Sequence, residues 1–226
     1  MEDQGFYAIA LDGDGAPCRV LGSNAGHLLF SGLAEPERAA DVTRTLLSAR
    51  FRTGWGLRTL ATRQSRYNPM SYHNGSVWPH DTALCVAGMA RYGERDAVAR
   101  GLDELYSAAV NFDMRLPELF CGFSRETGEP PVPYPVACMP QAWAAGSVFL
   151  LLQASLGIDI DAPGRRVRVD RPRLLDRGEG QDHSQYGAEE AHQGGHVGDG
   201  RQNDQTPLQE AELDRPGSSD RGFQLP

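Results

Sequence analysis

Five stretches with helical periodicity, separated by segments rich in proline and glycine, constrain the fold of this 226-residue chain more than any other feature. In the fourth stretch, Val98, Leu102 and Leu105 recur with the spacing of one helix face, whereas the third stretch is apolar nearly all round, which is typical of a buried helix. The stretches are residues 23–34, 36–51, 79–93, 93–112 and 139–157. This pattern predicts an all-α fold in which helices form the core and long loops gather at one end.

The beginning of the chain has a different pattern. Apolar side chains alternate in residues 5–21 around the sequence Asp12-Gly13-Asp14-Gly15, which predicts a short N-terminal β-hairpin with its turn at the glycines. A calcium loop is the alternative interpretation of these two aspartates. The acidic spacing stops after the second of them, so the turn is favoured. A short β-prone segment, RRVRVD at residues 165–170, follows the last helical stretch.

The composition changes sharply near Leu175. From residue 176 to the C-terminus there are eleven acidic residues and four arginines, so this segment carries −7 of the formal net charge of −8. It has few large apolar residues, and such a sequence cannot bury enough surface to offset the entropy lost on ordering. We therefore expect a globular domain over residues 1–173 and a disordered, acidic C-terminal tail over residues 174–226.

Charge and motif content argue against several classes of function. The net charge of −8 gives no basis for a nucleic-acid partner. The longest apolar run, near residues 148–152, is too short to cross a membrane, and the N-terminus lacks signal-peptide features, so a cytoplasmic location is expected. The four cysteines show no ligand spacing, so we expect buried thiols and no metal or other cofactor. They are Cys18, Cys85, Cys121 and Cys138.

The segment YNPMSYHNGSVWPHD, residues 67–81, has the composition of a binding loop. Its two prolines and its glycine restrict regular structure. Tyr72, His73, Asn74 and Trp78 offer flat apolar faces edged by hydrogen-bonding groups. A sugar ring presents an apolar C–H face and a rim of hydroxyls, so such a mixture fits it well. The segment therefore predicts a sugar site.

Outside this loop, Glu118 is the first candidate for catalysis. It lies among apolar neighbours in RLPELFCG, a setting that suits a general base or acid, although a helix-start carboxylate that binds backbone N–H groups is the alternative. Gln141 and Trp143 stand at the start of the last helical stretch, where a Gln can cap the helix and a Trp can belong to the core. Asp81 is interpreted as a helix N-terminal acid. His27 fits a core histidine or a site histidine.

Two more features of the sequence allow a binding interpretation. Trp55 lies between Gly54 and Gly56, and either a sugar platform or a packing wedge between helices would explain it. His73 and His80 are seven residues apart with no third ligand nearby in the sequence, so no metal site is expected there.

Five sequence blocks, taken together, resemble one group of glycoside hydrolases. The blocks are, in order, SNAGHLLFSGLA, GWGLRTLA, YNPMSYHNGSVWPHDTALCVAGMARYG, RLPELFCGF and PYPVACMPQAWAAGSVFLLLQASLG. They look like the C-terminal part of the catalytic domain of bacterial amylo-α-1,6-glucosidase-like proteins, which belong with glycogen-debranching and mannosylglycerate-hydrolase-like enzymes. The resemblance runs from about Gly5 to Pro172, and residues 67–93 are its most specific part.

The resemblance implies a fold, a reaction and a site. The fold is an (α/α)6 toroid, of which this chain would supply about five helices. The reaction is inverting hydrolysis of α-glucosidic or related linkages in an oligosaccharide or glycoside substrate, with two carboxylates about 6.5–9.5 Å apart. Glu118 falls at the position that resembles the catalytic base. The sugar subsite would be lined by Tyr72, His73, Gly75, Trp78, Gln141 and Trp143.

The chain also departs from the family pattern. A complete toroid has twelve helices, and the family's general acid, an Asp, would lie in the part that is absent. We therefore expect that the chain alone does not hydrolyse glycosides at a normal rate, and that it associates with the missing part of the domain. The alternatives are a non-catalytic carbohydrate-binding or pseudoenzyme module and a purely structural helical array.

Overall fold

The computed structural model of the chain describes residues 1–126, 128–170 and 172, which form part of one compact unit. Its helices are α1 (Asn24–Ser31), α2 (Pro36–Leu46), α3 (Pro79–Arg91), α4 (Arg95–Val110) and α5 (Ala142–Leu156). Each helix lies within one of the five predicted stretches, so the prediction of a mainly helical fold is confirmed. No helix in the described part is long and apolar enough to cross a membrane. The predicted tail, residues 174–226, lies outside the described residues.

The β-structure consists of two small antiparallel hairpins. β1 (Ala10–Leu11) pairs with β2 (Pro17–Cys18), and the Asp12 carboxylate accepts backbone N–H groups inside the connecting turn, as the turn interpretation of DGDG predicts. These strands are shorter than the alternating segment suggested. β3 (Ile158–Asp161) pairs with β4 (Arg166–Val169), of which the sequence predicted the second strand only. A 3-10 helix at Glu2–Gln4 precedes the first hairpin.

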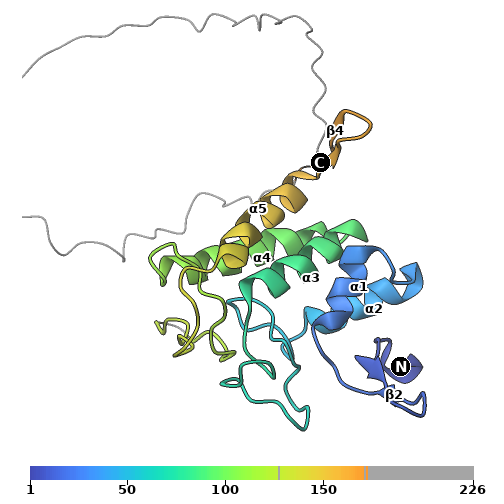
Figure 1. The fold of residues 1–226 in the computed structure, drawn as a ribbon, viewed down its shortest axis with the longest axis vertical. Helices are drawn as coiled ribbons and strands as arrows, with labels where there is room; N and C mark the ends of the chain where they lie inside the picture. The colour runs from blue at the N-terminus through green and yellow to red at the C-terminus, as the bar shows by residue number, and fades with distance from the viewer. Residues whose placement is uncertain (127, 171, 173–226) are drawn as a thin grey trace, which may run out of the picture. The chain divides into compact units, whose positions relative to one another are not determined.

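Helix α3 is the centre of the array and packs against α1, α4 and α5 (Figure 1). α1 and α3 run in the same direction, because Gly26 of α1 lies against Cys85 while Gly88, one turn further along α3, lies against Leu29. A Cβ at either glycine would collide with the opposite helix, so the two glycines permit the close approach. At the far ends of the same helices, the Tyr92 hydroxyl donates to the Ala34 carbonyl at 2.7 Å.

Helix α5 has the same direction as α3. Trp143 at the start of α5 stacks on His80 at the start of α3, whereas the start of α4 lies near Gly157 at the end of α5. α1, α3 and α5 therefore point their N-terminal ends toward the same side of the array.

The largest hydrophobic cluster lies among α1 to α5 and includes Phe6, Leu29, Phe51, Met89 and Leu105, all essentially inaccessible to solvent. Burial of side chains of this size stabilises the fold by roughly 1.5–3 kcal/mol each. The four cysteines are all free. Cys85 and Cys121 are buried as expected, but Cys18 is only partly buried and Cys138 is exposed, because both lie in surface segments.

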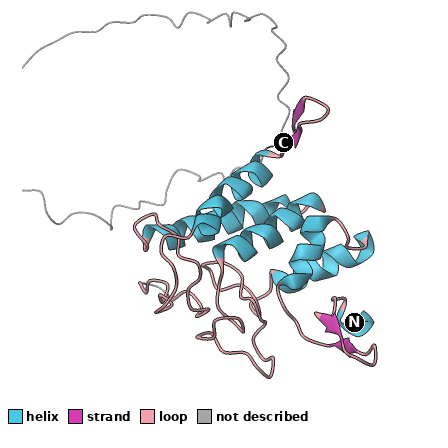
Figure 2. Cartoon of the chain, in the orientation of Figure 1, coloured by secondary structure: helices cyan, strands magenta, loops and turns pink. Residues whose placement is uncertain are grey.

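The long loops gather on one side of α3, α4 and α5 (Figure 2). They are joined by isolated antiparallel bridges that run from Arg58 to Val77, from Val77 to Phe120 and from Phe120 to Pro133. Val77 and Phe120 exchange both backbone hydrogen bonds, at 2.9 and 3.0 Å. These bridges tie the segment before α3 to the segment that carries Glu118.

Arg58 holds the same loops together from inside. Its side chain is almost fully buried and donates to the carbonyls of Gly122 at 2.7 Å and Arg52 at 2.9 Å, and to the Ser124 hydroxyl at 2.8 Å. Each bond from a buried guanidinium to a neutral acceptor offsets part of the cost of removing the charge from water. The segment after Glu118 is thereby fixed to the turn after α2.

Candidate active site

The candidate site begins with a hydrogen bond between two loops. The Tyr72 hydroxyl, in the loop before α3, donates to Oε1 of Glu118 at 2.7 Å. The Glu118 backbone N–H donates to the Cys138 carbonyl at 2.8 Å, so the carboxylate is anchored by its own main chain as well. The bond to Glu118 raises the pKa of Tyr72, which keeps the phenol protonated as a donor.

Six rings, including that of Tyr72 itself, gather around this contact, and we call them the aromatic cluster: Tyr72, His73, Trp78, His80, Tyr134 and Trp143. Tyr72 lies at its centre, with ring centroids 4.7 Å from His73, 4.9 Å from Trp78 and 5.7 Å from Tyr134, all at steep angles. His80 stacks on Trp143 at 4.9 Å. The rings come from the loop before α3, the proline-rich loop before α5, and the first turns of both helices. They bring together segments that are up to 71 residues apart in sequence.

The two tryptophans of the cluster differ in exposure. Trp78 is buried, and its indole N–H donates to the Tyr72 carbonyl at 3.1 Å and to the Ser76 hydroxyl at 3.0 Å. Trp143 is 49% exposed. Trp78 is therefore a fixed wall, whereas Trp143 offers a free aromatic face of the kind on which a sugar ring stacks.

Gly75 and Gln141 contribute differently from the aromatic residues. Gly75 is buried with φ of 139°, and its N–H donates to the Thr59 hydroxyl at 3.0 Å. It lies so close to Gly122 that a Cβ on Gly122 would overlap its carbonyl oxygen. Gly75 thus shapes the backbone of the site. Gln141 precedes α5 beside Trp143, and its side chain does not cap the helix.

Sequence reasoning missed two members of the cluster. It treated His80 only as a metal-ligand candidate and did not single out Tyr134. The signal for Tyr134 was an aromatic side chain inside the proline-rich sequence PVPYPV, which marks an irregular loop. The signal for His80 was its place at the start of a helix that follows a binding loop.

His80 is held in an environment that disfavours its charged form. Burial lowers its pKa, and the nearby charges of Asp81, His27 and Glu118 act in both directions. Its Nδ1 atom is buried with no hydrogen-bond partner. The imidazole stacked on Trp143 therefore favours its neutral form.

The low pKa of His80 predicts a pH dependence of stability. As the pH falls below about 6.5, the unfolded chain binds a proton at His80 before the folded chain does, so the free energy of unfolding decreases until the pH passes the folded pKa. His80→Gln removes this penalty. Urea unfolding between about pH 7 and about pH 5 should show the variant losing less stability than the wild type, whereas two parallel pH profiles would contradict this account.

Two residues whose role the sequence left open, His27 and Trp55, have clear partners in the structure. Nε2 of His27, on α1, lies 2.6 Å from Oδ1 of Asp81, on α3, and the Asp81 carboxylate is buried. Asp81 does lie in the first turn of α3, but it pairs with another helix. Trp55 is the packing wedge: it is buried against Val77 and Phe120, with the Arg125 guanidinium 4.3 Å from its ring.

Parallel helices with a carboxylate and an aromatic cluster at their N-terminal side agree with the expectation of a helical glycoside hydrolase domain. The family model of the mannosylglycerate hydrolase MGH1-like glycoside hydrolase domain matches residues 1–122, more than half of the chain. The chain therefore belongs to that family. The comparison with curated proteins finds no match.

Solved structures share the fold. The GH63 mannosylglycerate hydrolase from Thermus thermophilus in complex with glucose superposes with a TM-score of 0.52 and 21% identity, over 67% of this chain and 34% of that one. Its complex with Tris and D-glycerate gives 0.51 and 19%, over 66% and 34%. Neutral trehalase Nth1 from Saccharomyces cerevisiae gives 0.51 and 17%, over 73% and 28%. The chain thus spans about a third of the length of these relatives.

Proposed function

We propose that the chain carries the catalytic-base side of the sugar pocket of an inverting glycosidase that acts on α-glucosidic or related linkages. The hydrogen bond from Tyr72 to Glu118 inside the aromatic cluster carries this proposal. The amylo-α-1,6-glucosidase activity and the part in glycogen debranching expected from the sequence belong to the same proposal.

Glu118 acts as the general base. Its Oε1 accepts from Tyr72, which orients the carboxylate, and the carboxylate takes a proton from water. Water then attacks the anomeric carbon from the face opposite the leaving group, so the configuration inverts. The second carboxylate, which protonates the leaving oxygen, belongs to the rest of the catalytic domain. The chain associates with that remaining part to complete the site.

The substrate is an oligosaccharide or glycoside whose non-reducing sugar stacks on Trp143. Tyr72, His73 and Gln141 supply directional hydrogen-bonding groups, and Trp78 and Gly75 fix the wall behind them. One of the structural relatives was solved in complex with glucose, which supports a hexose as the bound ring. We propose that the chain acts in the cytoplasm, without nucleic acid or membrane.

Trp143→Ala tests the sugar pocket. Calorimetric titration of the full chain with glucose and maltooligosaccharides should show binding that the variant weakens about 10-fold or more, because a stacked aromatic face is lost. Phe149→Ala is the matched control, since Phe149 is an exposed aromatic residue on the same helix and outside the aromatic cluster. Equal affinity in the wild type and the Trp143 variant would rule out this pocket.

A non-catalytic carbohydrate-binding module is the second candidate. It is favoured by one observation, namely that the chain spans only about a third of the length of its glycosidase relatives and still brings the aromatic cluster together. Sugar binding that requires Trp143, with no turnover even of activated glycosides, would select this second function.

A further inference from the structure

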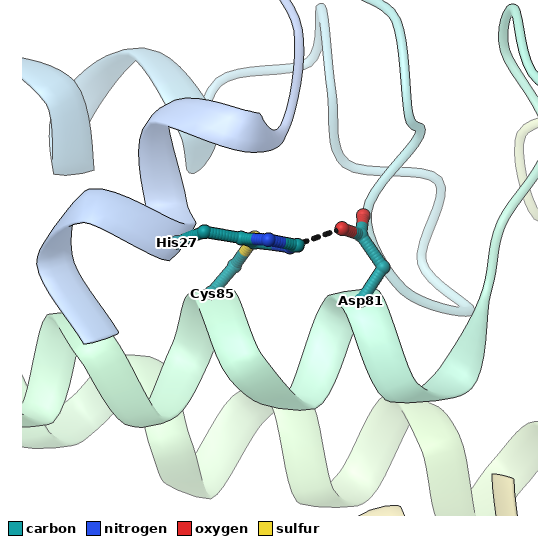
Figure 3. A group of neighbouring side chains, drawn as sticks. All are labelled: His27, Asp81 and Cys85. Carbon is teal, nitrogen blue, oxygen red and sulfur yellow. Dashed lines mark hydrogen bonds and ion pairs between the residues drawn. The ribbon is translucent and has the colours of Figure 1, made fainter. Parts of the chain in front are cut away.

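Three side chains that can bind a metal ion converge where α1 meets α3 (Figure 3). His27 reaches from α1 toward Asp81, and Cys85 lies one turn further along α3, on the same face of the helix as Asp81. One ligand atom from each residue lies within 4.8 Å of the other two. The three residues differ in chemistry and offer a nitrogen, an oxygen and a sulfur donor.

The backbones behind these donors are fixed. Gly26, next to His27, lies directly against the Cys85 side chain, and Cys85 Sγ is 3.3 Å from the Ser23 carbonyl. α1 and α3 cannot move closer together or further apart without disturbing this contact. The donors therefore adjust by side-chain rotation alone, as a preorganised metal site requires.

The group formed by His27, Asp81 and Cys85 has little positive charge and few hydrogen-bond donors around it. Oδ1 of Asp81 faces His27, but Oδ2 is buried and has no hydrogen-bond partner. The Cys85 side chain is fully buried, and its Sγ lies within 4.8 Å of an Asp81 carboxylate oxygen. A protonated His27 neutralises one carboxylate oxygen and leaves the other unsatisfied, which costs free energy in a buried place.

We propose that His27, Asp81 and Cys85 bind a divalent metal ion of the zinc class. Zinc accepts this mixture of nitrogen, oxygen and sulfur ligands, and its charge would balance the carboxylate and a thiolate. Donors around a tetrahedral zinc ion lie about 3.5 Å apart. The 2.6 Å hydrogen bond between His27 and Asp81 therefore opens and Sγ turns inward.

The ion has a route to the site and room for a fourth ligand. The His27 side chain is 40% exposed, whereas the Asp81 side chain is 9% exposed. Solvent reaches the cluster past the imidazole, and water completes the coordination on that side. Binding displaces the thiol proton, and also the imidazole proton where His27 is charged, so the affinity increases with pH.

Titration of the full chain with Zn²⁺ tests the site, followed by Co²⁺ as a spectroscopic probe. One equivalent of metal should bind, and the cobalt complex should show the charge-transfer absorption of a thiolate ligand. Cys85→Ser should abolish that absorption. His27→Gln and Cys85→Ser should each weaken zinc binding by at least about 100-fold. His27 is half-exposed, so its variant decides the matter even where the buried cysteine variant does not fold.

A matched control separates this site from adventitious binding. Cys121→Ser removes a different buried cysteine and should bind zinc like the wild type. No binding of stoichiometric zinc would overturn the proposal. Binding that survives in both His27→Gln and Cys85→Ser would overturn it as well. The sugar titration is a separate readout, so either proposal can fail alone.

Discussion

Replacement of Glu118 by glutamine is expected to lower the turnover of an activated glycoside about 10²–10⁴-fold, the contribution typical of a general base. The isolated full chain can be assayed with α-glucosyl fluoride, because fluoride leaves with little need of an acid. Water activation by Glu118 is then the step under test. The amide keeps the shape of the side chain and still accepts from Tyr72, so sugar affinity should stay within a few-fold.

The same assay reports the stereochemistry. Proton NMR of the first-formed product should show the β-anomer, because the attacking water enters opposite the fluoride. Glu129→Gln, an exposed carboxylate of the same long loop, should retain wild-type turnover. Equal rates in wild type and Glu118→Gln would remove Glu118 from the mechanism. Unactivated maltooligosaccharides need the second carboxylate, so rapid hydrolysis of them by the chain alone would refute the expected division of the site.

Gly122→Ala is expected to destabilise the chain by about 3 kcal/mol and to abolish sugar binding, since overpacking that cannot relax moves the backbone. The added methyl group would overlap the Gly75 carbonyl oxygen, which belongs to the main chain and cannot rotate away. Moving these two glycines apart would also weaken the backbone hydrogen bonds between Val77 and Phe120. Tyr72 and Glu118, which lie on the two separated segments, would lose their contact.

Gly146→Ala is the matched control for this prediction. A Cβ at Gly146 meets nothing within 4 Å, and the residue lies inside α5, where alanine is favoured over glycine. This variant should be more stable than the wild type by up to about 1 kcal/mol. Urea unfolding compares the two variants directly. A Gly122 variant as stable as the wild type would show that the loops are not locked at this position.

The helices could be predicted because their signals are local. Pro36 and Pro79 begin helices, Gly157 ends one, and the apolar periodicity between such markers survives in the folded chain. Glu118, Tyr72 and Trp143 could be named from composition and from the family resemblance. In the structure Tyr72 contacts Glu118 directly, and Trp78 links Tyr72 to Trp143. Their catalytic and binding roles remain predictions.

The parts that escaped prediction depend on partners far apart in the sequence. No local pattern predicts the partners of Arg58, and only the fold brings its guanidinium to the carbonyl of Gly122, 64 residues away. His27 and Asp81 are 54 residues apart, so no spacing rule could connect them with Cys85. Tyr134 belongs to the aromatic cluster but lies in a proline-rich loop. No sequence periodicity predicts the path of such a loop.

The indole N–H resonances of the chain test its central claim most directly, because its three tryptophans occupy three different environments. Trp143 is half-exposed in the aromatic cluster, Trp78 is buried in the same cluster, and Trp55 is buried elsewhere against Phe112 and Phe120. Titration of the ¹⁵N-labelled full chain with maltooligosaccharide should shift the Trp143 signal most, the Trp78 signal less and the Trp55 signal not at all. Three unchanged signals at saturating sugar, or a shift confined to Trp55, would contradict a sugar pocket at Glu118.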